Sequence, residues 1–253
     1  MTKERLATAL QSAGRQLAQG LLQLVYPSTC FVCDQFLPAE QAHFCTKCRS
    51  GLTTDPFPCC PRCAGTVGPY VHLEDGCNAC RDQSFHFECA VRLGPYDGLL
   101  RQVILRLKHA PGEGLAEVLG ELWASHLEQR LRDLKADVIV PVPLHWWRRW
   151  TRGYNQSEVL AQAMANRLHV PCKPRWLRRV RNTARQFTLS PTARRPNVRN
   201  AFLAPARTEL PGKTVLLVDD ILTTCSTASD AARALRAAGA ARVVVAVLAG
   251  GHG

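Results

Sequence analysis

Four C-x-x-C pairs near the start of the chain constrain its fold more than any other feature. Ten of the twelve cysteines lie between residues 30 and 89, and eight of these ten form the pairs. One turn can present both thiolates of a pair to a tetrahedral ion, and the turn of a second pair completes the site. The eight predicted ligands are Cys30, Cys33, Cys45, Cys48, Cys60, Cys63, Cys77 and Cys80.

The spacing of these pairs is typical of two consecutive zinc ribbons. Gaps of 11 and 13 residues separate the two pairs of each ribbon. We predict two Zn²⁺ ions, one in each ribbon, with interleaved pairing as the alternative and Cys59 as a possible substitute for Cys60. Four thiolates leave no open coordination position, so the metal is expected to be structural. The segment has few aliphatic residues, and the metal is therefore expected to supply its folding free energy, about 10 kcal/mol or more per site.

A disulfide framework is the competing interpretation of the cysteines. It would need an oxidising compartment, and the first residues of the chain carry no secretory signal. We therefore predict a cytoplasmic protein. No stretch approaches the roughly 18 consecutive apolar residues of a membrane-spanning helix, which predicts no membrane span. Leucines at steps of three and four from Leu6 to Leu24 instead predict an amphipathic helix over residues 1–26 that packs on the rest of the protein.

Basic residues are concentrated in one part of the chain. The formal net charge is +12, and residues 141–200 hold thirteen Lys and Arg against one acid, Glu158. The remaining residues are balanced. A segment with one sign of charge indicates a polyanionic partner, either a phosphate-rich small molecule or nucleic acid. The alternative is a basic surface that serves only solubility, and so sharp a cluster of one sign favours the partner.

Three tryptophans lie within this basic segment. Stacking faces interleaved with cations are the combination that binds single-stranded DNA, and packing of the tryptophans in a core is the alternative. The residues concerned are Trp146, Trp147 and Trp150 with Arg148, Arg149 and Arg152.

Beyond the ribbons, strands and helices alternate. The sequence predicts strands over residues 90–93, 138–140, 214–218 and 243–248, and helices over 99–108, 115–134, 157–168 and 226–238. Gly239 follows the last helix as a C-terminal cap. This alternation predicts an α/β fold with a parallel sheet covered on both faces by helices, preceded by the double zinc ribbon. The predicted domains are residues 1–26, 27–88 and 89–253.

A candidate phosphate site follows the strand that begins at residue 214. The strand delivers Asp219 and Asp220 at its carboxyl end, where open α/β sheets bind ligands. A turn rich in hydroxyls then opens a helix whose free N–H groups suit a phosphate monoester. The two carboxylates could hold vicinal ribose hydroxyls directly or through Mg²⁺. The residues of the turn are Thr223, Thr224, Cys225, Ser226 and Thr227.

This stretch resembles the PRPP-binding signature of type I phosphoribosyltransferases. With the ribbons in front, the chain resembles the ComF/GntX family of competence-associated proteins over roughly residues 27–249. The order and spacing of several further elements carry the resemblance. They are Leu107-Lys108, the turn Pro141-Val142-Pro143-Leu144, the run Arg152-Gly153-Tyr154-Asn155-Gln156, and Gln186, Arg195, Asn197 and Asn200-Ala201-Phe202.

The resemblance implies a type I phosphoribosyltransferase-like fold and a role for each motif. Asp219 and Asp220, as the catalytic pair, would contact the ribose hydroxyls of PRPP or a related phosphosugar, and residues 223–227 would hold its 5′-phosphate. Val142, Pro143 and Leu144 would face the diphosphate with their backbone. Residues 178–200, the Arg-rich segment, would form a lid over the reacting centre. The basic and lid residues concerned are Arg152, Arg179, Arg185 and Arg195.

One position departs from the family pattern. The signature has Gly where this chain has Cys225. Gly in a phosphate loop permits close approach of the backbone and a positive φ, so the side chain of Cys225 is expected to weaken the binding of PRPP and with it catalysis.

Two functions of different classes follow. The first is Mg²⁺-dependent phosphoribosyl transfer from PRPP to an unidentified acceptor, in a protein linked to competence, DNA uptake or DNA utilisation and to nucleoside metabolism. The second is a non-catalytic zinc-ribbon adaptor that binds single-stranded DNA on the same fold, with the DNA-uptake machinery as a partner. Calorimetry with PRPP, with and without Mg²⁺, discriminates between them.

Overall fold

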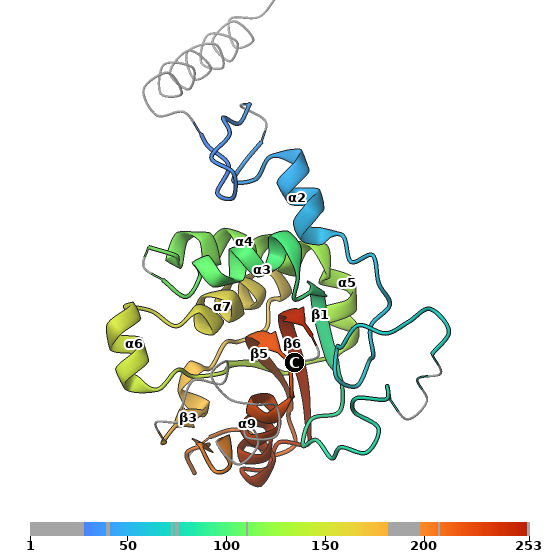
Figure 1. Ribbon diagram of the computed structural model, residues 1–253. Helices are drawn as coiled ribbons and strands as arrows, with labels where there is room; N and C mark the ends of the chain where they lie inside the picture. The colour runs from blue at the N-terminus through green and yellow to red at the C-terminus, as the bar shows by residue number, and fades with distance from the viewer. Residues whose placement is uncertain are drawn as a thin grey trace, which may run out of the picture. The chain divides into compact units, whose positions relative to one another are not determined.

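The computed structural model describes residues 28–38, 41–71, 73, 76–109, 111–181, 198–206 and 208–251 (Figure 1). The predicted helix over residues 1–26 lies outside this range, as does most of the Arg-rich segment. The chain divides into two compact units, residues 1–50 and 51–253. The second ribbon thus belongs to the same unit as the sheet.

The first ribbon begins with a tight turn that presents Cys30 and Cys33. Thr29 and Phe36 form an antiparallel bridge around it, and the N–H of Asp34 donates to the carbonyl of Cys30 across 2.9 Å. Helix α2 (Thr46–Thr53) begins directly after Cys45 and carries Cys48 in its first turn. The second pair of ligands is therefore presented by the start of a helix.

A four-stranded parallel sheet forms the centre of the larger unit, which confirms the predicted fold class. Its strands are β1 (Ala90–Pro95), β2 (Val138–Pro141), β5 (Thr214–Leu222) and β6 (Arg242–Gly250), in the order β1-β6-β5-β2. The apolar runs of β5 and β6 are buried almost throughout. Because all strands are parallel, their carboxyl ends meet at one edge, and that edge carries Asp219 and Asp220.

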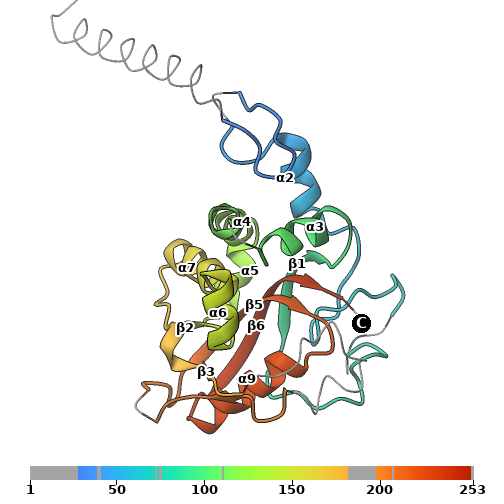
Figure 2. The same ribbon diagram turned by 60° about the vertical axis from the view of Figure 1, so that its left-hand side comes forward.

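Helices cover both faces of this sheet, as predicted. Helix α7 (Gln156–Leu168) packs against β2 and β5, and α9 (Ser226–Ala237) packs against β5 and β6. Figures 1 and 2 place α9 on the opposite side of the sheet from α7 and from α4 (Glu113–His126). Helix α9 ends at Ala237, and Gly239 follows with a φ of 101°, which confirms the predicted glycine at the helix end.

The predicted helix over residues 115–134 is two helices. α4 ends at His126 and α5 (Glu128–Asp133) follows after Leu127, whose φ of −105° and ψ of 18° lie outside the helical range. The predicted helix over 99–108 is α3 (Gly98–Arg106), and Asp97 caps it by accepting a hydrogen bond from the N–H of Gly98.

Several short elements of the described residues were not predicted. They are α2, α6 (Trp146–Arg152), the 3-10 helix η1 (Pro174–Trp176), and a two-stranded antiparallel ladder of β3 (Arg178–Arg179) and β4 (Phe202–Leu203). The ladder joins the two ends of the Arg-rich segment, because β3 lies at its start and β4 follows it. Periodicity cannot reveal elements this short.

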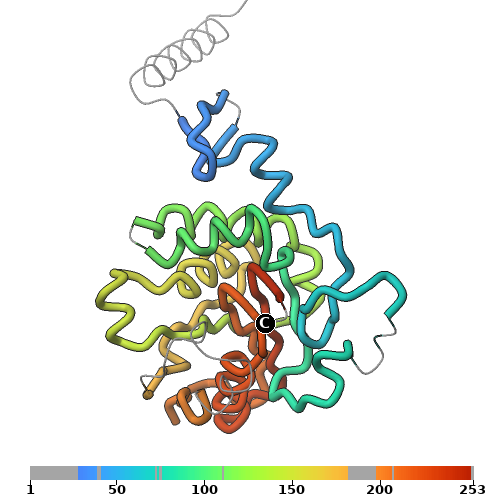
Figure 3. The backbone as a smooth tube through the Cα atoms, viewed as in Figure 1, coloured from blue at the N-terminus to red at the C-terminus, as the bar shows by residue number. Residues whose placement is uncertain are grey.

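The second ribbon shares a hydrophobic core with the sheet and with α9. Its four cysteine ligands and Phe87 belong to the same buried cluster as Val215, Leu217 and Leu235. The path of the chain from this ribbon into β1 can be followed in Figure 3. The sequence predicts that metal binding supplies the folding free energy of the whole Cys-rich segment. For the second ribbon this is only partly so, because residues of the sheet supply part of its hydrophobic core.

Candidate functional site: a phosphate loop and two zinc centres

The eight predicted ligands form two clusters of four. Cys30, Cys33, Cys45 and Cys48 make the first, and Cys60, Cys63, Cys77 and Cys80 make the second, with all Sγ atoms of a cluster within 4.8 Å of one another. This confirms sequential pairing and excludes the interleaved alternative. Cys59 lies outside both clusters and pairs with Thr66 in an antiparallel bridge instead.

The geometry of both clusters fits zinc. A tetrahedral ion with Zn–S bonds of about 2.3 Å places neighbouring sulfur atoms about 3.8 Å apart. The Sγ atoms of Cys33 and Cys45 are 3.8 Å apart, and those of Cys63 and Cys77 are 3.6 Å apart. None of these thiols forms a disulfide. The two four-cysteine clusters are therefore consistent with two structural zinc sites.

Asp219 and Asp220 lie near the carboxyl end of β5, and both are held by the first turn of α7. The hydroxyl of Ser157 donates to Oδ1 of Asp219 across 2.9 Å. The amide of Gln156 donates to Oδ2 of Asp220 across 3.2 Å, and Nζ of Lys108 lies 3.6 Å from the same oxygen. These contacts orient both carboxylates before any ligand arrives.

The electrostatics of this pair are unusual for aspartates. Both carboxylates are largely enclosed by the protein: Asp220 has 7 % of its surface exposed, and Asp219 somewhat more. Burial, and then the neighbouring carboxylate of Asp220, raise the pKa of Asp219 to about 7. The site thus holds a carboxyl group that changes its charge near neutral pH, a property common at ligand sites.

The loop after β5 contains a residue in the left-handed backbone conformation. Cys225 precedes the first residue of α9 and has a φ of 61° and a ψ of −1°, in the left-handed region. Its side chain is 4 % exposed and lies in the hydrophobic core. The thiol therefore points away from solvent, and the cysteine adopts the backbone conformation that favours glycine.

The hydroxyls of the loop gather at the start of α9. Oγ1 of Thr224 and Oγ of Ser226 lie 2.9 Å apart, and Thr223, Thr224 and Thr227 are partly exposed. The first N–H groups of a helix have no intrahelical acceptor, and the helix dipole favours an anion beside them. This arrangement can bind a phosphate monoester.

The turn from Pro141 to Leu144 begins at the last residue of β2 and is bonded to β5. The N–H of Val142 donates to the carbonyl of Val218 on β5 across 2.8 Å, and Nδ2 of Asn155 donates to the carbonyl of Val142 across 3.2 Å. Pro143 has no N–H. Of the three residues predicted here, Leu144 is therefore the one whose N–H can face a ligand.

The predicted basic residues are only partly described. Arg152 donates to Oε1 of Gln156, which in turn contacts Asp220. Arg179 lies on β3, with its guanidinium 5.4 Å from the ring centre of Phe202, and burial lowers its pKa to about 10. Arg185 and Arg195 lie outside the described residues.

Sequence reasoning missed Asp230, which anchors the end of the Arg-rich segment. This buried carboxylate on α9 accepts hydrogen bonds from the N–H groups of Asn200, Ala201 and Phe202 at 3.0, 2.9 and 3.3 Å. It also pairs with Arg233 at 2.9 Å. The sequence could have indicated this residue, because Asp230 is an acid on the apolar face of an Ala-rich helix.

The three tryptophans of α6 lie on the surface. Trp146, Trp147 and Trp150 are 67 %, 49 % and 74 % exposed, so the alternative of packing in a core is wrong. With Arg149 and Gly153 they line a shallow hollow of about 630 Å³.

No helix in the described part of the chain is long and apolar enough to cross a membrane.

Comparison with known proteins identifies a family for each of two parts of the chain. Residues 154–253 match the phosphoribosyl transferase domain family, and residues 21–82 match the double zinc ribbon domain family. The chain is 33 % identical over 220 residues to Competence protein F of Haemophilus influenzae, covering 85 % of this chain and 94 % of that protein.

Two further relatives cover similar lengths. DNA utilization protein YhgH of Escherichia coli K12 is 34 % identical over 227 residues, with 88 % of this chain and 96 % of that protein covered. Competence protein ComFC of Bacillus subtilis is 24 % identical over 234 residues, with 87 % and 93 % covered. These matches confirm the resemblance seen in the sequence: the chain belongs to the ComF/YhgH family of competence and DNA-utilisation proteins, in which a double zinc ribbon precedes a phosphoribosyltransferase domain.

Proposed function

We propose that this protein binds PRPP at the carboxyl end of β5 and transfers its phosphoribosyl group to a nucleophilic acceptor. The backbone of Cys225 carries the proposal, because its φ of 61° retains the conformation of the glycine that it replaces. Its side chain is buried in the core. The sulfur therefore does not occupy the space beside the start of α9 that a 5′-phosphate would need.

The residues around the loop have complementary roles in this proposal. Asp219 and Asp220 accept hydrogen bonds from the ribose hydroxyls, and Ser157 and Gln156 hold the two carboxylates in place. Pyrophosphate departs with negative charge while the anomeric carbon gains positive charge. Lys108, 3.6 Å from Asp220, and Arg179 supply cations near the leaving group.

The carboxylates also suit Mg²⁺, which prefers oxygen ligands. Asp219, the more exposed of the two, is the residue that would contact an ion bound to PRPP. The ion would neutralise the diphosphate, and the chain's own residues would orient the ribose. Thiolate zinc ligands persist in a reducing compartment, which supports a cytoplasmic setting for the proposed reaction.

Titration calorimetry tests the proposal. Wild-type protein should bind PRPP, more tightly with Mg²⁺ than without it. Asp219→Asn combined with Asp220→Asn should abolish binding, because the ribose hydroxyls lose their ionised acceptors. Asp133→Asn, a change at an exposed acid on α5 that contacts Gln129, is the matched control and should bind normally. Equal PRPP affinity in the double variant and the wild type would refute the assignment.

A second function, binding of single-stranded DNA, is favoured by the exposed tryptophans of α6. Trp147 contacts both of the others, with ring centres 5.6 Å from Trp146 and 5.4 Å from Trp150. Solvent-exposed aromatic rings in a basic segment suit the stacking of bases. The names of the relatives, which refer to competence and DNA utilisation, support a partner in DNA uptake for this function.

Fluorescence anisotropy with a labelled oligonucleotide tests this second function. Trp146→Ala with Trp150→Ala should weaken binding about 5- to 150-fold, the range expected for the loss of one base stack. Tyr70→Ala, which removes a 94 % exposed ring elsewhere, should not change it. Affinity should also fall steeply as salt rises. An unchanged affinity in the double variant would remove α6 from the DNA surface.

A further inference from the structure

Arg92 is a charged residue in the middle of an otherwise apolar strand. It lies on β1, and its side chain is fully buried. Burying a guanidinium is costly unless its donors find acceptors. Here Nε and Nη2 contact the two oxygens of Asp55 at 2.9 and 3.1 Å, and Nη1 donates to the carbonyl of Ala64 and the hydroxyl of Thr66 at 2.9 and 2.8 Å.

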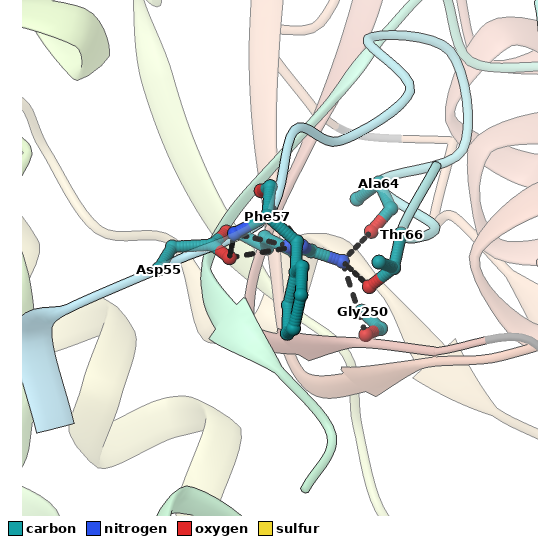
Figure 4. A network of polar contacts seen from close by, with 6 residues as sticks. Asp55, Phe57, Ala64, Thr66 and Gly250 are labelled. Carbon is teal, nitrogen blue, oxygen red and sulfur yellow. Dashed lines mark hydrogen bonds and ion pairs between the residues drawn. The ribbon is translucent and has the colours of Figure 1, made fainter. Parts of the chain in front are cut away.

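These acceptors come from segments that are far apart in the sequence. Asp55, Ala64 and Thr66 surround the Cys60-Cys63 turn of the second ribbon, whereas Gly250, at 3.4 Å from Nη1, ends β6. Figure 4 shows the acceptors arranged around one guanidinium. A Cβ built on Gly250 would lie 2.0 Å from the carbonyl oxygen of Ala64. The ribbon backbone therefore lies directly against the end of β6.

The end of β6 is bonded to the start of the phosphate loop. Gly250 pairs with Leu222, the last residue of β5, and the N–H of Gly251 donates to the carbonyl of Leu222 across 2.9 Å. Thr223, the first residue of the loop, follows directly. Arg92 is thus linked through Gly250, Gly251 and Leu222 to the residues that would hold the phosphate.

The second ribbon reaches the same loop by an independent path. Cys60, Cys77 and Phe87 share a buried cluster with Cys225 and with Ala228 of α9. The N–H of His86 also donates to the hydroxyl of Ser229 across 3.2 Å. The second zinc cluster and the loop therefore belong to one hydrophobic core, and the ribbon also contacts the first turn of α9 directly at Ser229.

The zinc cluster shapes the part of the ribbon that Arg92 contacts. Ala64 directly follows the ligand Cys63, has a φ of 55°, and donates its N–H to the carbonyl of Cys60 across 2.8 Å. A tetrahedral ion bound to Cys60 and Cys63 would hold this turn closed. The carbonyl of Ala64 would then stay directed at the guanidinium.

We infer that Arg92 is a positioning residue that couples the second zinc site to the phosphate loop, and that the second zinc, unlike the first, is required for phosphate binding. This inference rests on the proposed function for its ligand. The coupling itself is a property of the fold. It gives the two ribbons different roles: the second supports the phosphoribosyl site, and the first belongs to a separate compact unit.

Two measurements on matched variants test the inference. Hydrogen exchange of the peptide covering residues 219–229 reports the order of the loop, and calorimetry reports PRPP affinity. Arg92→Met and Cys63→Ser should speed exchange in this peptide and weaken PRPP binding about tenfold or more, because displacement of a binding group by an ångström has effects of that size. Arg92→Lys keeps the charge but not the planar fork, so it should recover only part of the loss.

The controls remove similar groups at other places. Arg242→Met breaks a bidentate pair with Glu88, with contacts of 2.8 Å, at the opposite end of β6. Cys48→Ser removes a buried ligand of the first zinc. Both should leave exchange of residues 219–229 and PRPP affinity within about twofold of wild type, since effects at independent sites do not couple.

The outcomes separate this inference from the proposed function. If Arg92→Met or Cys63→Ser fails to fold, Thr66→Val, which removes one acceptor of Nη1, should still speed loop exchange. Unchanged exchange in folded Arg92→Met, or equal effects of Cys48→Ser and Cys63→Ser, would overturn the coupling. If wild-type protein binds no PRPP, the proposed function fails, and the exchange data still decide whether Arg92 orders the loop.

Discussion

Ser157 on α7 donates its hydroxyl hydrogen to Oδ1 of Asp219 on β5 across 2.9 Å, joining residues 62 positions apart. The same carboxylate accepts the N–H of Asp220 at 2.9 Å. Asp219 is thereby held in one orientation even though burial and a neighbouring acid disfavour its charge. Preorganisation of this kind costs stability and favours ligand binding.

The first prediction concerns the pH dependence of stability at Asp219. The pKa of Asp219 is raised from 3.8 to about 7 in the folded state. Between these two pH values the folded protein therefore keeps a proton that the unfolded chain has released. The free energy of unfolding therefore falls as pH rises from about 4 to 7. Asp219→Asn lacks this loss, and its Tm should exceed that of the wild type by roughly 8–16 °C at pH 8 and match it near pH 4. Calorimetric melts at both pH values check this, and a difference independent of pH would contradict it.

A second prediction concerns Cys225. Its thiol is buried and its backbone already adopts the left-handed conformation, so Cys225→Gly should leave PRPP affinity within about threefold. Cys225→Val should lower the free energy of unfolding by about 2 kcal/mol or more, because a β-branched residue is strained at positive φ. Urea unfolding and calorimetry measure the two effects. Much tighter PRPP binding by Cys225→Gly would instead show that the sulfur obstructs the ligand.

The third prediction concerns the order of zinc release. Cys33 of the first cluster is exposed, whereas all four ligands of the second cluster are buried. A chelator should therefore remove the first zinc faster than the second, giving two kinetic phases of equal amplitude with a chromogenic chelator. Elemental analysis should find two ions per chain before treatment. The slow phase should disappear in Cys63→Ser and the fast phase in Cys48→Ser, and the opposite assignment would contradict the prediction.

The fourth prediction concerns Asp230, which holds the chain at the end of the Arg-rich segment. Asp230→Ala leaves the N–H groups of Asn200, Ala201 and Phe202 without their acceptor, and should lower the free energy of unfolding by about 3 kcal/mol. Asp230→Asn keeps one acceptor oxygen and should lose about half as much. Urea unfolding provides the measurement. A loss below about 1 kcal/mol for the alanine variant would show that water replaces the carboxylate easily.

Local patterns identified most of the strands and ligands. The cysteine pairs were recognisable because each pair lies within one turn, and their spacing along the chain predicted the two clusters that the structure shows. The apolar runs of β5 and β6 could be recognised as strands in the sequence, because buried parallel strands are continuously apolar. Asp219, Asp220 and the loop to Thr227 are contiguous, so their chemistry could be inferred together before their surroundings were known.

Only the tertiary structure decided the contacts between distant residues. Arg92 reaches Gly250 across 158 positions, and the tryptophans of α6 are exposed although three of them within five residues suit a core equally well. Composition and periodicity record which residues are neighbours along one helix or strand. Whether a charge is buried, paired or open to a ligand depends on which elements pack together, and that packing brought the second ribbon into one hydrophobic core with the candidate phosphate loop.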